Sequence, residues 1–381
     1  MDIKDFLVWN RSASASLRAE AAAAAAKAYL YSDMQDDVRA GLDTAMTVLL
    51  DDPAPIVRLA MADALTNSEK APRHIILSLA GDLSEISSTV LSRSPALFDG
   101  ELVDFVATME EHAQLAIASR PLVSAGVAAA LTELGSEESC LVLLDNPGAI
   151  IAAVSLRRLA DRLGDDPIMR TKLLERDDLP ITVRHLLIGN LGQALNNLVL
   201  LNDWLGPERA NLVTREACDQ ATVALSLEGP TEDLIALAEH LRLTKQLTTS
   251  LLLRALCAGN VEFFAAAMSV LSRIPIPRLG AMIYDRQLTA FRAAYRRSGL
   301  PERAFGAFAT AIKTCSQYSG ESVDRDRRSR YTKRIVDEVL TRYENGGGDE
   351  MSELMTILRR FAAEANRAAA REFLEIEVEA A

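Results

Sequence analysis

Residues 49–57 read LLDDPAPIV and residues 143–151 read LLDNPGAII, so the two stretches align without a gap at an offset of 94. Residues 173–184, LLERDDLPITVR, carry the same pattern with two extra residues before the final Val-Arg. Each copy joins an apolar helix end, a turn rich in Asp, Asn and Pro, and the start of a new helix. Because one pair of short helices cannot bury its apolar face alone, repetition of such pairs predicts a stack, that is, an α-solenoid.

The repeats are irregular. Weaker copies centre on Val90 and Val127, and the intervals from Val57 through these two to Ile151 and then Val183 are 33, 37, 24 and 32 residues. Most of these intervals suit a helix-pair repeat, whereas the interval of 24 does not. We therefore predict an α-solenoid of irregular helical repeats with a helical C-terminal extension.

Composition also favours an all-α fold. The chain has 381 residues, of which 49% are hydrophobic, and it holds only 19 Gly and 13 Pro. This shortage of turn residues argues against a fold built from many β-hairpins. We count roughly twenty short helices and no strand. Aromatic residues make up 5% of the chain, which predicts a core of Ala, Leu, Val and Ile.

The chain divides into three parts by pattern and charge. Residues 1–187 form the predicted acidic repeat array, and residues 188–344 the helical C-terminal part, which is basic from about residue 240. Residues 345–381 hold a Gly-rich linker and a terminal amphipathic helix. Residues 1–239 carry a net charge of −17, and residues 240–343 a net charge of +10. Such asymmetry concerns partners and electric fields rather than the fold.

No sequence motif indicates catalysis or metal binding. The four histidines have no metal-ligand spacing, no phosphate-binding glycine loop is present, and no Ser elbow occurs. The four cysteines are isolated in sequence and are interpreted as small apolar residues in a reducing compartment. We expect no catalytic residue, no cofactor and no metal site, although a Cys–His pair assembled only by the fold stays open.

One basic stretch stands out. Asp324 precedes Arg328 by four residues, and the next such pair is Asp326 and Arg330; both have the order that stabilises a helix. Arg325 and Arg327 have no such pair. The stretch is interpreted as a salt-bridged surface helix, a docking site for an acidic protein or the acidic N-terminal part, or a nucleic-acid site. The candidate partner-binding residues are Arg325, Arg327, Arg328, Arg330, Lys333 and Arg334.

Several stretches resemble known families. Residues 57–65, VRLAMADAL, resemble the second part of a HEAT-type repeat. About residues 40–300 are similar to the alphaproteobacterial HEAT-like family catalogued as domain of unknown function 2336. The stretches that carry this second resemblance are residues 71–94, 117–120, 144–149 and 176–180. The resemblance implies a helical repeat fold and implies no activity.

Together these observations predict a non-enzymatic interaction scaffold or adaptor with an unidentified protein partner. The alternative is a HEAT-like protein that binds nucleic acid through residues 240–343, although a pI near 5.0 opposes that reading. The absence of a long apolar run and of a leader-like N-terminus leads us to expect a cytoplasmic protein without a membrane partner. Fold-level analogy places the adaptor in a bacterial signalling or stress pathway. The oligomeric state is left open.

Overall fold

The protein is all-α. The computed structural model describes residue 9 and residues 12–227, 229–285, 288–318, 328–344 and 352–379. Within these ranges there is no β-strand, and one isolated parallel bridge joins Val123 and Ala149. The contacts divide the chain into two compact units, residues 1–179 (unit 1) and 180–381 (unit 2). No helix in the described part of the chain is long and apolar enough to cross a membrane.

Unit 1 consists of short helices. They are α2 (Ala15–Tyr31), α3 (Asp36–Leu49), α4 (Pro55–Leu65), α5 (Arg73–Ala80), α6 (Ser84–Arg93), α7 (Asp99–Thr108), α8 (Glu111–Ala118), α9 (Ala125–Leu134), α10 (Glu137–Asp145), α11 (Ala153–Leu163) and α12 (Pro167–Leu174). Local chemistry begins several of them: Ser124 caps α9, and Asp166 caps α12 while Pro167 occupies its first turn.

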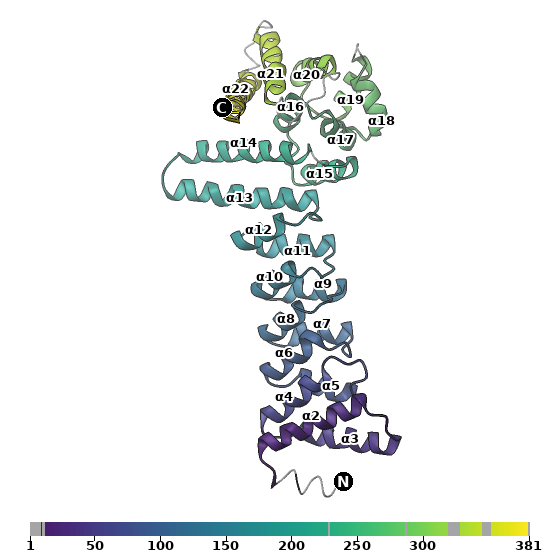
Figure 1. Cartoon of the computed structure of the whole chain (residues 1–381). Helices are drawn as coiled ribbons and strands as arrows, with labels where there is room; N and C mark the ends of the chain where they lie inside the picture. Colours follow the sequence, from purple (N-terminus) through teal and green to yellow (C-terminus); the bar gives the residue numbers. More distant parts are fainter. Residues whose placement is uncertain are drawn as a thin grey trace. The chain divides into compact units, whose positions relative to one another are not determined.

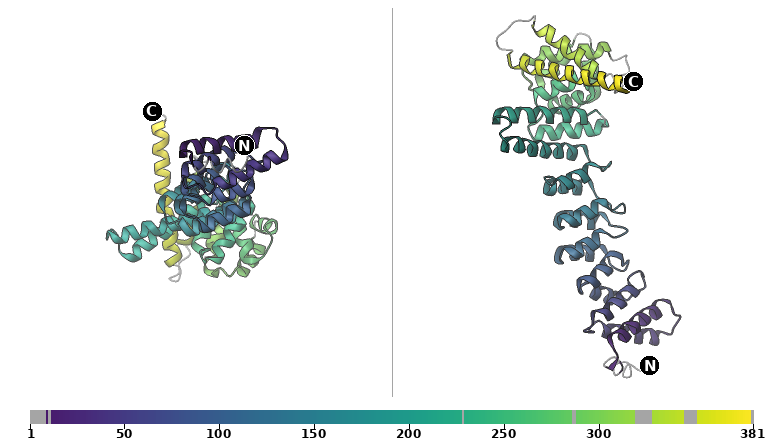
Figure 2. Two further views of the ribbon diagram at one scale, coloured as in Figure 1. Left: turned by 90° about the horizontal axis from the view of Figure 1, so that it is seen from below. Right: turned by 60° about the vertical axis from the view of Figure 1, so that its left-hand side comes forward.

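The helices of unit 1 lie in two rows. In one row each helix contacts the next but one along the chain, from α2 through α4, α6, α8 and α10 to α12. In the other row, α7 contacts α9, and α9 contacts α11. Figures 1 and 2 show these rows in different orientations. Each helix is therefore covered by its neighbours in the stack, as expected when single pairs cannot form a core.

The sequence copies at residues 49–57 and 143–151 build the same turn. Asp52 accepts a hydrogen bond from the backbone N–H of Ala54 at 2.9 Å. Asn146, 94 residues later, accepts one from the N–H of Gly148 at 2.8 Å. A short polar side chain that binds the backbone two residues ahead stops one helix and redirects the chain toward the next.

Arginine side chains join successive pairs. Arg120 is 9% exposed and donates hydrogen bonds to the carbonyl oxygens of Leu91 (2.5 Å) and Ser94 (2.7 Å) at the end of α6. Arg162 likewise donates to the carbonyl oxygens of Thr132 and Gly135 at the end of α9. The last carbonyls of a helix have no partner within the helix, so these arginines satisfy them from the following pair.

Unit 2 contains longer helices. They are α13 (Ile181–Leu201), α14 (Pro207–Leu225), α15 (Thr231–Leu243), α16 (Thr249–Cys257), α17 (Val261–Ser272), α18 (Ile276–Ile283), α19 (Thr289–Arg297), α20 (Phe305–Tyr318), α21 (Arg328–Glu344) and α22 (Ser352–Glu379), with a 3₁₀ turn at Glu302–Ala304. The helices α13 and α14 pack together as a hairpin, and α16 contacts α14, α17, α20 and α21.

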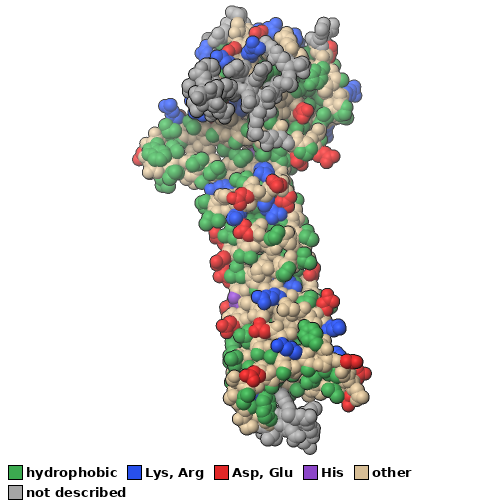
Figure 3. Space-filling model, viewed as in Figure 1, with side chains coloured by type: hydrophobic (Ala, Val, Ile, Leu, Met, Phe, Trp, Pro, Cys, Tyr) green, Lys and Arg blue, Asp and Glu red, His purple; other side chains and the backbone are tan. Residues whose placement is uncertain are grey.

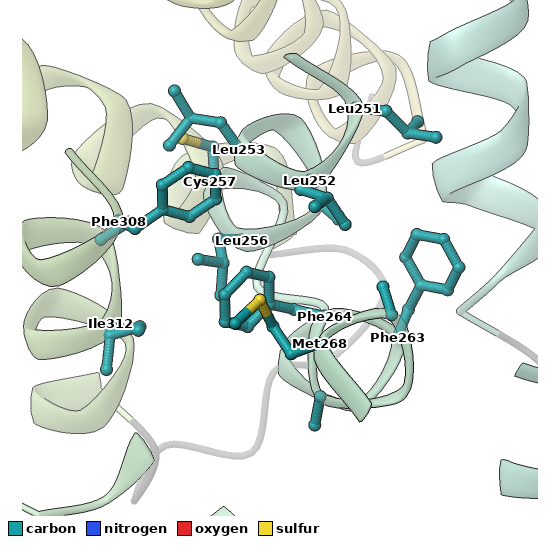
Figure 4. Close-up of a cluster of buried hydrophobic side chains, with 14 of the residues drawn as sticks. Leu251, Leu252, Leu253, Leu256, Cys257, Phe263, Phe264, Met268, Phe308 and Ile312 are labelled. Atoms are coloured by element: carbon teal, nitrogen blue, oxygen red, sulfur yellow. The ribbon is translucent and has the colours of Figure 1, made fainter. Parts of the chain in front are cut away.

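The core of unit 2 surrounds α16, in which every residue from Leu251 to Cys257 is buried. Figure 4 shows Leu252, Leu256, Phe264 and Phe308 pointing toward one another there. The rings of Phe264 and Phe308 stack with centroids 5.6 Å apart, and Tyr295 joins the cluster. The expectation of a core built only from Ala, Leu, Val and Ile is therefore wrong for unit 2, because the few aromatic residues of the chain concentrate here.

The boundary between the units differs from the predicted one. The prediction places it after residue 187, which lies inside α13, whereas the contacts divide the chain after Leu179. The reason is that the third sequence copy ends in Ile181-Thr182-Val183-Arg184, which is the first turn of α13 and packs with unit 2. The predicted linker at residues 345–351 lies outside the described residues.

The terminal helix α22 packs on α21. Leu358, Phe361 and Ala365 are its buried side chains within the described part. The guanidinium of Arg254 on α16 pairs with the carboxylate of Glu364 and lies 4.2 Å from the centroid of the Phe361 ring. Polar and apolar contacts together thus seat α22 within unit 2.

Candidate functional site

The structure places four of the six predicted partner-binding residues in the first turns of α21. Arg325 and Arg327 lie outside the described residues, and Arg328 and Arg330 belong to the first turn of the helix. The side chains of Lys333 and Arg334 are exposed. Their part in binding stays a prediction.

Other basic side chains of unit 2 are paired with carboxylates. Arg292 and Arg296 on α19 both bind the carboxylate of Glu302, at 3.0 and 3.1 Å. Arg254 pairs with Glu364, and Arg360 donates to Glu216 at 2.8 Å. Because Arg254, Arg292 and Arg296 belong to residues 240–343, the positive charge of that stretch is partly neutralised by carboxylates within unit 2.

A different feature emerges in unit 1, where large apolar side chains are exposed at the beginnings of α7, α9 and α11. Phe98 directly precedes α7 and is 63% exposed; Leu122 precedes α9 and is 78% exposed. Ile150 and Val154, at the start of α11, are 64% and 74% exposed. These four residues are called the apolar edge below. Single exposed apolar residues are ordinary, but several at the same end of one row are not.

The local backbone holds the apolar edge in place. The N–H of Val123 donates to the carbonyl oxygen of Gly148 at 3.1 Å, and the N–H of Ile150 donates to that of Val123 at 2.9 Å. These two bonds form the Val123–Ala149 bridge, so the backbone segments that carry Leu122 and Ile150 run side by side. Asn146 reinforces the turn, since its Nδ2 donates to the carbonyl oxygen of Ala118 at 2.7 Å.

Phe98 is held by a neighbouring pair. The guanidinium of Arg73 lies 3.7 Å from the centroid of the Phe98 ring and also pairs with Glu101. The carboxylate of Glu101 in turn accepts the N–H of Phe98 at 2.8 Å, which caps the start of α7. Arg73 and Glu101 thus fix the position of the Phe98 ring, while most of its surface is exposed to solvent.

Unit 2 contains a polar cavity of about 510 Å³ between α13, α14 and residues 245–251. His185, which is 7% exposed, lines it, and burial beside His240 lowers the pKa of His185 to about 4. Burial raises the pKa of Asp219, on the opposite helix, to about 6. Neither the Nδ1 atom of His185 nor the Asp219 carboxylate makes a hydrogen bond within the described part of the chain. The cavity therefore holds two titratable groups that burial keeps away from their usual pKa values.

Three of the four cysteines are buried, which agrees with their interpretation as small apolar residues. Cys140, Cys257 and Cys315 are buried, and burial raises the pKa of each thiol, that of Cys315 to about 11. Cys218 is only half-buried and lies against Gly192. Thiols with raised pKa values are poor nucleophiles at neutral pH. The described residues contain no cluster of three or more His, Cys, Asp or Glu that could hold a metal ion.

The fold defines an all-α protein, with packed short helices in unit 1 and longer helices in unit 2. Its sequence matches the profile of a family described as an uncharacterised protein conserved in bacteria, domain of unknown function 2336, over residues 86–347. This match covers more than two thirds of the chain, which therefore belongs to that family. It begins and ends further along the chain than the resemblance over residues 40–300. No curated protein and no solved structure matches the chain.

Proposed function

We propose that the protein is a non-enzymatic protein–protein interaction scaffold of the HEAT-like repeat type, in which unit 1 forms an α-solenoid. The observation that carries the proposal is the apolar edge. Four large apolar side chains are exposed at the beginnings of three helices of one row. Surfaces of this kind suit an extended apolar segment of another protein.

Charge supports a protein partner over a nucleic acid for this surface. Residues 1–239 carry a net charge of −17, which repels polyanions. Arg73 is the cation next to Phe98, and its charge is shared with Glu101. The expected partner therefore presents apolar side chains to the edge, with polar or basic groups around them.

A pull-down of the tagged full chain from native lysate, with and without nuclease, tests the proposal. The variant Leu122→Glu with Ile150→Glu places two charges on the apolar edge. We expect it to lose a discrete, nuclease-resistant protein partner while its circular dichroism melt stays unchanged, because both side chains are exposed. Leu83→Glu is the matched control, since Leu83 is 54% exposed but precedes α6 in the other row. Loss of the partner in the control as well, or retention in both, would contradict the proposal.

The exposed Lys333 and Arg334 support a second candidate, nucleic-acid binding through residues 240–343. That function requires the captured material to disappear with nuclease and binding to fall steeply as salt rises. It also requires Lys333→Glu with Arg334→Glu to abolish capture, and Leu122→Glu with Ile150→Glu to leave capture intact. The same pull-down therefore separates the two functions.

A further inference from the structure

The α13–α14 hairpin is polar on its inside. Gly192 and Asn196 of α13 are buried, and Asn196 Nδ2 donates to Asn211 Oδ1 on α14 at 2.9 Å. The hydroxyl of Thr214 donates to Asn196 Oδ1 at 3.3 Å. Gly192 lets the two backbones approach, because a Cβ there would lie 2.5 Å from the sulfur of Cys218. Small and polar residues, rather than leucines, thus join the two helices.

Four leucines in the second half of α13 are exposed to solvent, whereas Leu187 in its first half is buried. Leu191, Leu195, Leu198 and Leu201 are 40%, 51%, 47% and 84% exposed. With 3.6 residues per turn, these positions fall within an arc of about 120°. They are called the leucine stripe below. Trp204, in the turn to α14, is 66% exposed, and Figure 3 shows hydrophobic side chains gathered over the hairpin.

This arrangement reverses the usual amphipathic pattern. A helix at the surface of a globular unit normally buries its apolar face and exposes its polar one. Here the apolar face is left to solvent over three turns, and residues 185–202 contain no Asp, Glu, Lys or Arg, although a quarter of the chain is charged. A helix with this pattern is stable in water only when another apolar surface covers the stripe.

We propose that the leucine stripe is a dimer interface that a second copy of this chain covers. Two copies repel one another because each carries a net charge of −12. The repulsion is weakest where two uncharged surfaces meet, and residues 185–202 supply such a surface. The exposed parts of the four leucines and Trp204 amount to roughly 600 Å² per copy, close to the ~800 Å² per partner of a standard interface. Glu208 and Arg209, exposed at the start of α14, disfavour burial of the hairpin in a lipid bilayer instead.

A two-fold axis near the middle of the stripe makes this contact self-complementary. With the two α13 helices antiparallel, Leu195 meets the partner's Leu198, and Leu191 meets the partner's Leu201. The stripe spans about 15 Å along each helix, so all four leucines are paired at once. An isologous contact of this kind closes on itself and yields a dimer rather than a filament.

Light scattering after size exclusion tests the proposal on the full chain. We expect a mass twice the 41.4 kDa of one chain. Leu195→Glu with Leu198→Glu introduces four carboxylates at the centre of the interface. We expect this variant to weaken the dimer on the order of 100-fold or more and to run as a monomer with an unchanged helical circular dichroism spectrum. Leu122→Glu, on the apolar edge of unit 1, is the control and stays dimeric.

Three outcomes would overturn the proposal: a monomeric wild-type chain at every concentration, a dimer that survives the double substitution, or a dimer that Leu122→Glu also dissociates. Binding of the wild-type chain to neutral phosphatidylcholine vesicles, abolished by the double substitution, would assign the stripe to a membrane and also overturn it. The test is independent of partner capture through the apolar edge, because each surface has its own substitution.

Discussion

Gly148 lies directly against the backbone of Pro121: a Cβ at Gly148 would be 1.9 Å from the Pro121 carbonyl oxygen. The two residues belong to the loops that precede α11 and α9, and the Val123–Ala149 bridge joins those loops. The absence of a side chain at one position therefore sets the spacing of Leu122 and Ile150 on the apolar edge.

Gly148→Ala should separate these loops. No flexible side chain is available to move, because the atom that the new methyl group meets is backbone. We expect a loss of about 2–3 kcal/mol in the free energy of unfolding, measured by urea denaturation, together with weaker partner capture. Gly100→Ala is the control: nothing lies within 4 Å of its Cβ position in α7, so its stability should be equal or slightly higher. Equal stability of the two variants would refute the close approach.

The buried side chain of Arg120 should contribute more to the free energy of unfolding than an exposed arginine does. Arg120→Met leaves the carbonyl oxygens of Leu91 and Ser94 without their donor, and we expect a loss of about 3 kcal/mol. Arg158→Met is the matched control, because Arg158 pairs with Glu133 at a site where both side chains are about half exposed. Its free energy of unfolding should hardly change. Similar melts for both variants would show that the buried arginine does not join the helix pairs.

His185 and Asp219 should give opposite pH dependences of stability. The pKa of His185 falls from 6.5 to about 4 on folding, so the unfolded chain binds the proton first as pH drops. Its contribution, up to about 3 kcal/mol, is complete above pH 6.5 and is lost between pH 6.5 and 4. The pKa of Asp219 rises from 3.8 to about 6 on folding, so its contribution is present below pH 3.8 and is lost as pH rises toward 6.

Between pH 4 and 6 the two contributions therefore oppose one another. Denaturation of His185→Gln should show stability that falls as pH rises through this window, since only the Asp219 contribution remains. Asp219→Asn should show the reverse, a stability that rises with pH up to about 6.5. Parallel pH profiles for the two variants and the wild type would mean that neither group is buried as described.

Helix α22 should depend on Glu364. Glu364→Gln leaves the guanidinium of Arg254 buried without its carboxylate, and the Nε atom of Arg254 already has no hydrogen-bond partner among the described residues. We expect a cost of about 2 kcal/mol and faster amide hydrogen exchange in α22. Glu216→Gln, which breaks the more exposed pair with Arg360, should cost below about 1 kcal/mol. Unchanged exchange in α22 for Glu364→Gln would contradict this account.

Much of the fold follows from local sequence patterns. The all-α prediction is confirmed, since helix starts such as Asp166-Pro167 depend on nearest-neighbour chemistry that the sequence displays directly. The offset of 94 between Asp52 and Asn146 corresponds to a shared turn, because both side chains bind the backbone two residues ahead. Val57 is fully buried, in agreement with its place in the repeat pattern.

The functional surfaces could not be predicted in the same way. Leu122 and Ile150 are 28 residues apart, and nothing local reveals that they are exposed at the same end of neighbouring helices. Arg254 and Glu364 are 110 residues apart, and their pairing depends on how α22 packs. The leucine stripe is visible in the sequence as an uncharged run, but a run of leucines ordinarily indicates a buried face. The structure shows which side faces inward, because Asn196 is buried and bonded to Asn211 while the four leucines are exposed.

Photo-crosslinking in living cells tests the central claim most directly. A photoreactive phenylalanine analogue at Leu122 of the full chain should form a crosslink to one discrete protein, because this position is 78% exposed at the centre of the apolar edge. The same analogue at Thr108, exposed at the opposite end of α7, should not. No protein crosslink at Leu122, or the same products at both positions, would contradict the role of the apolar edge in binding a partner.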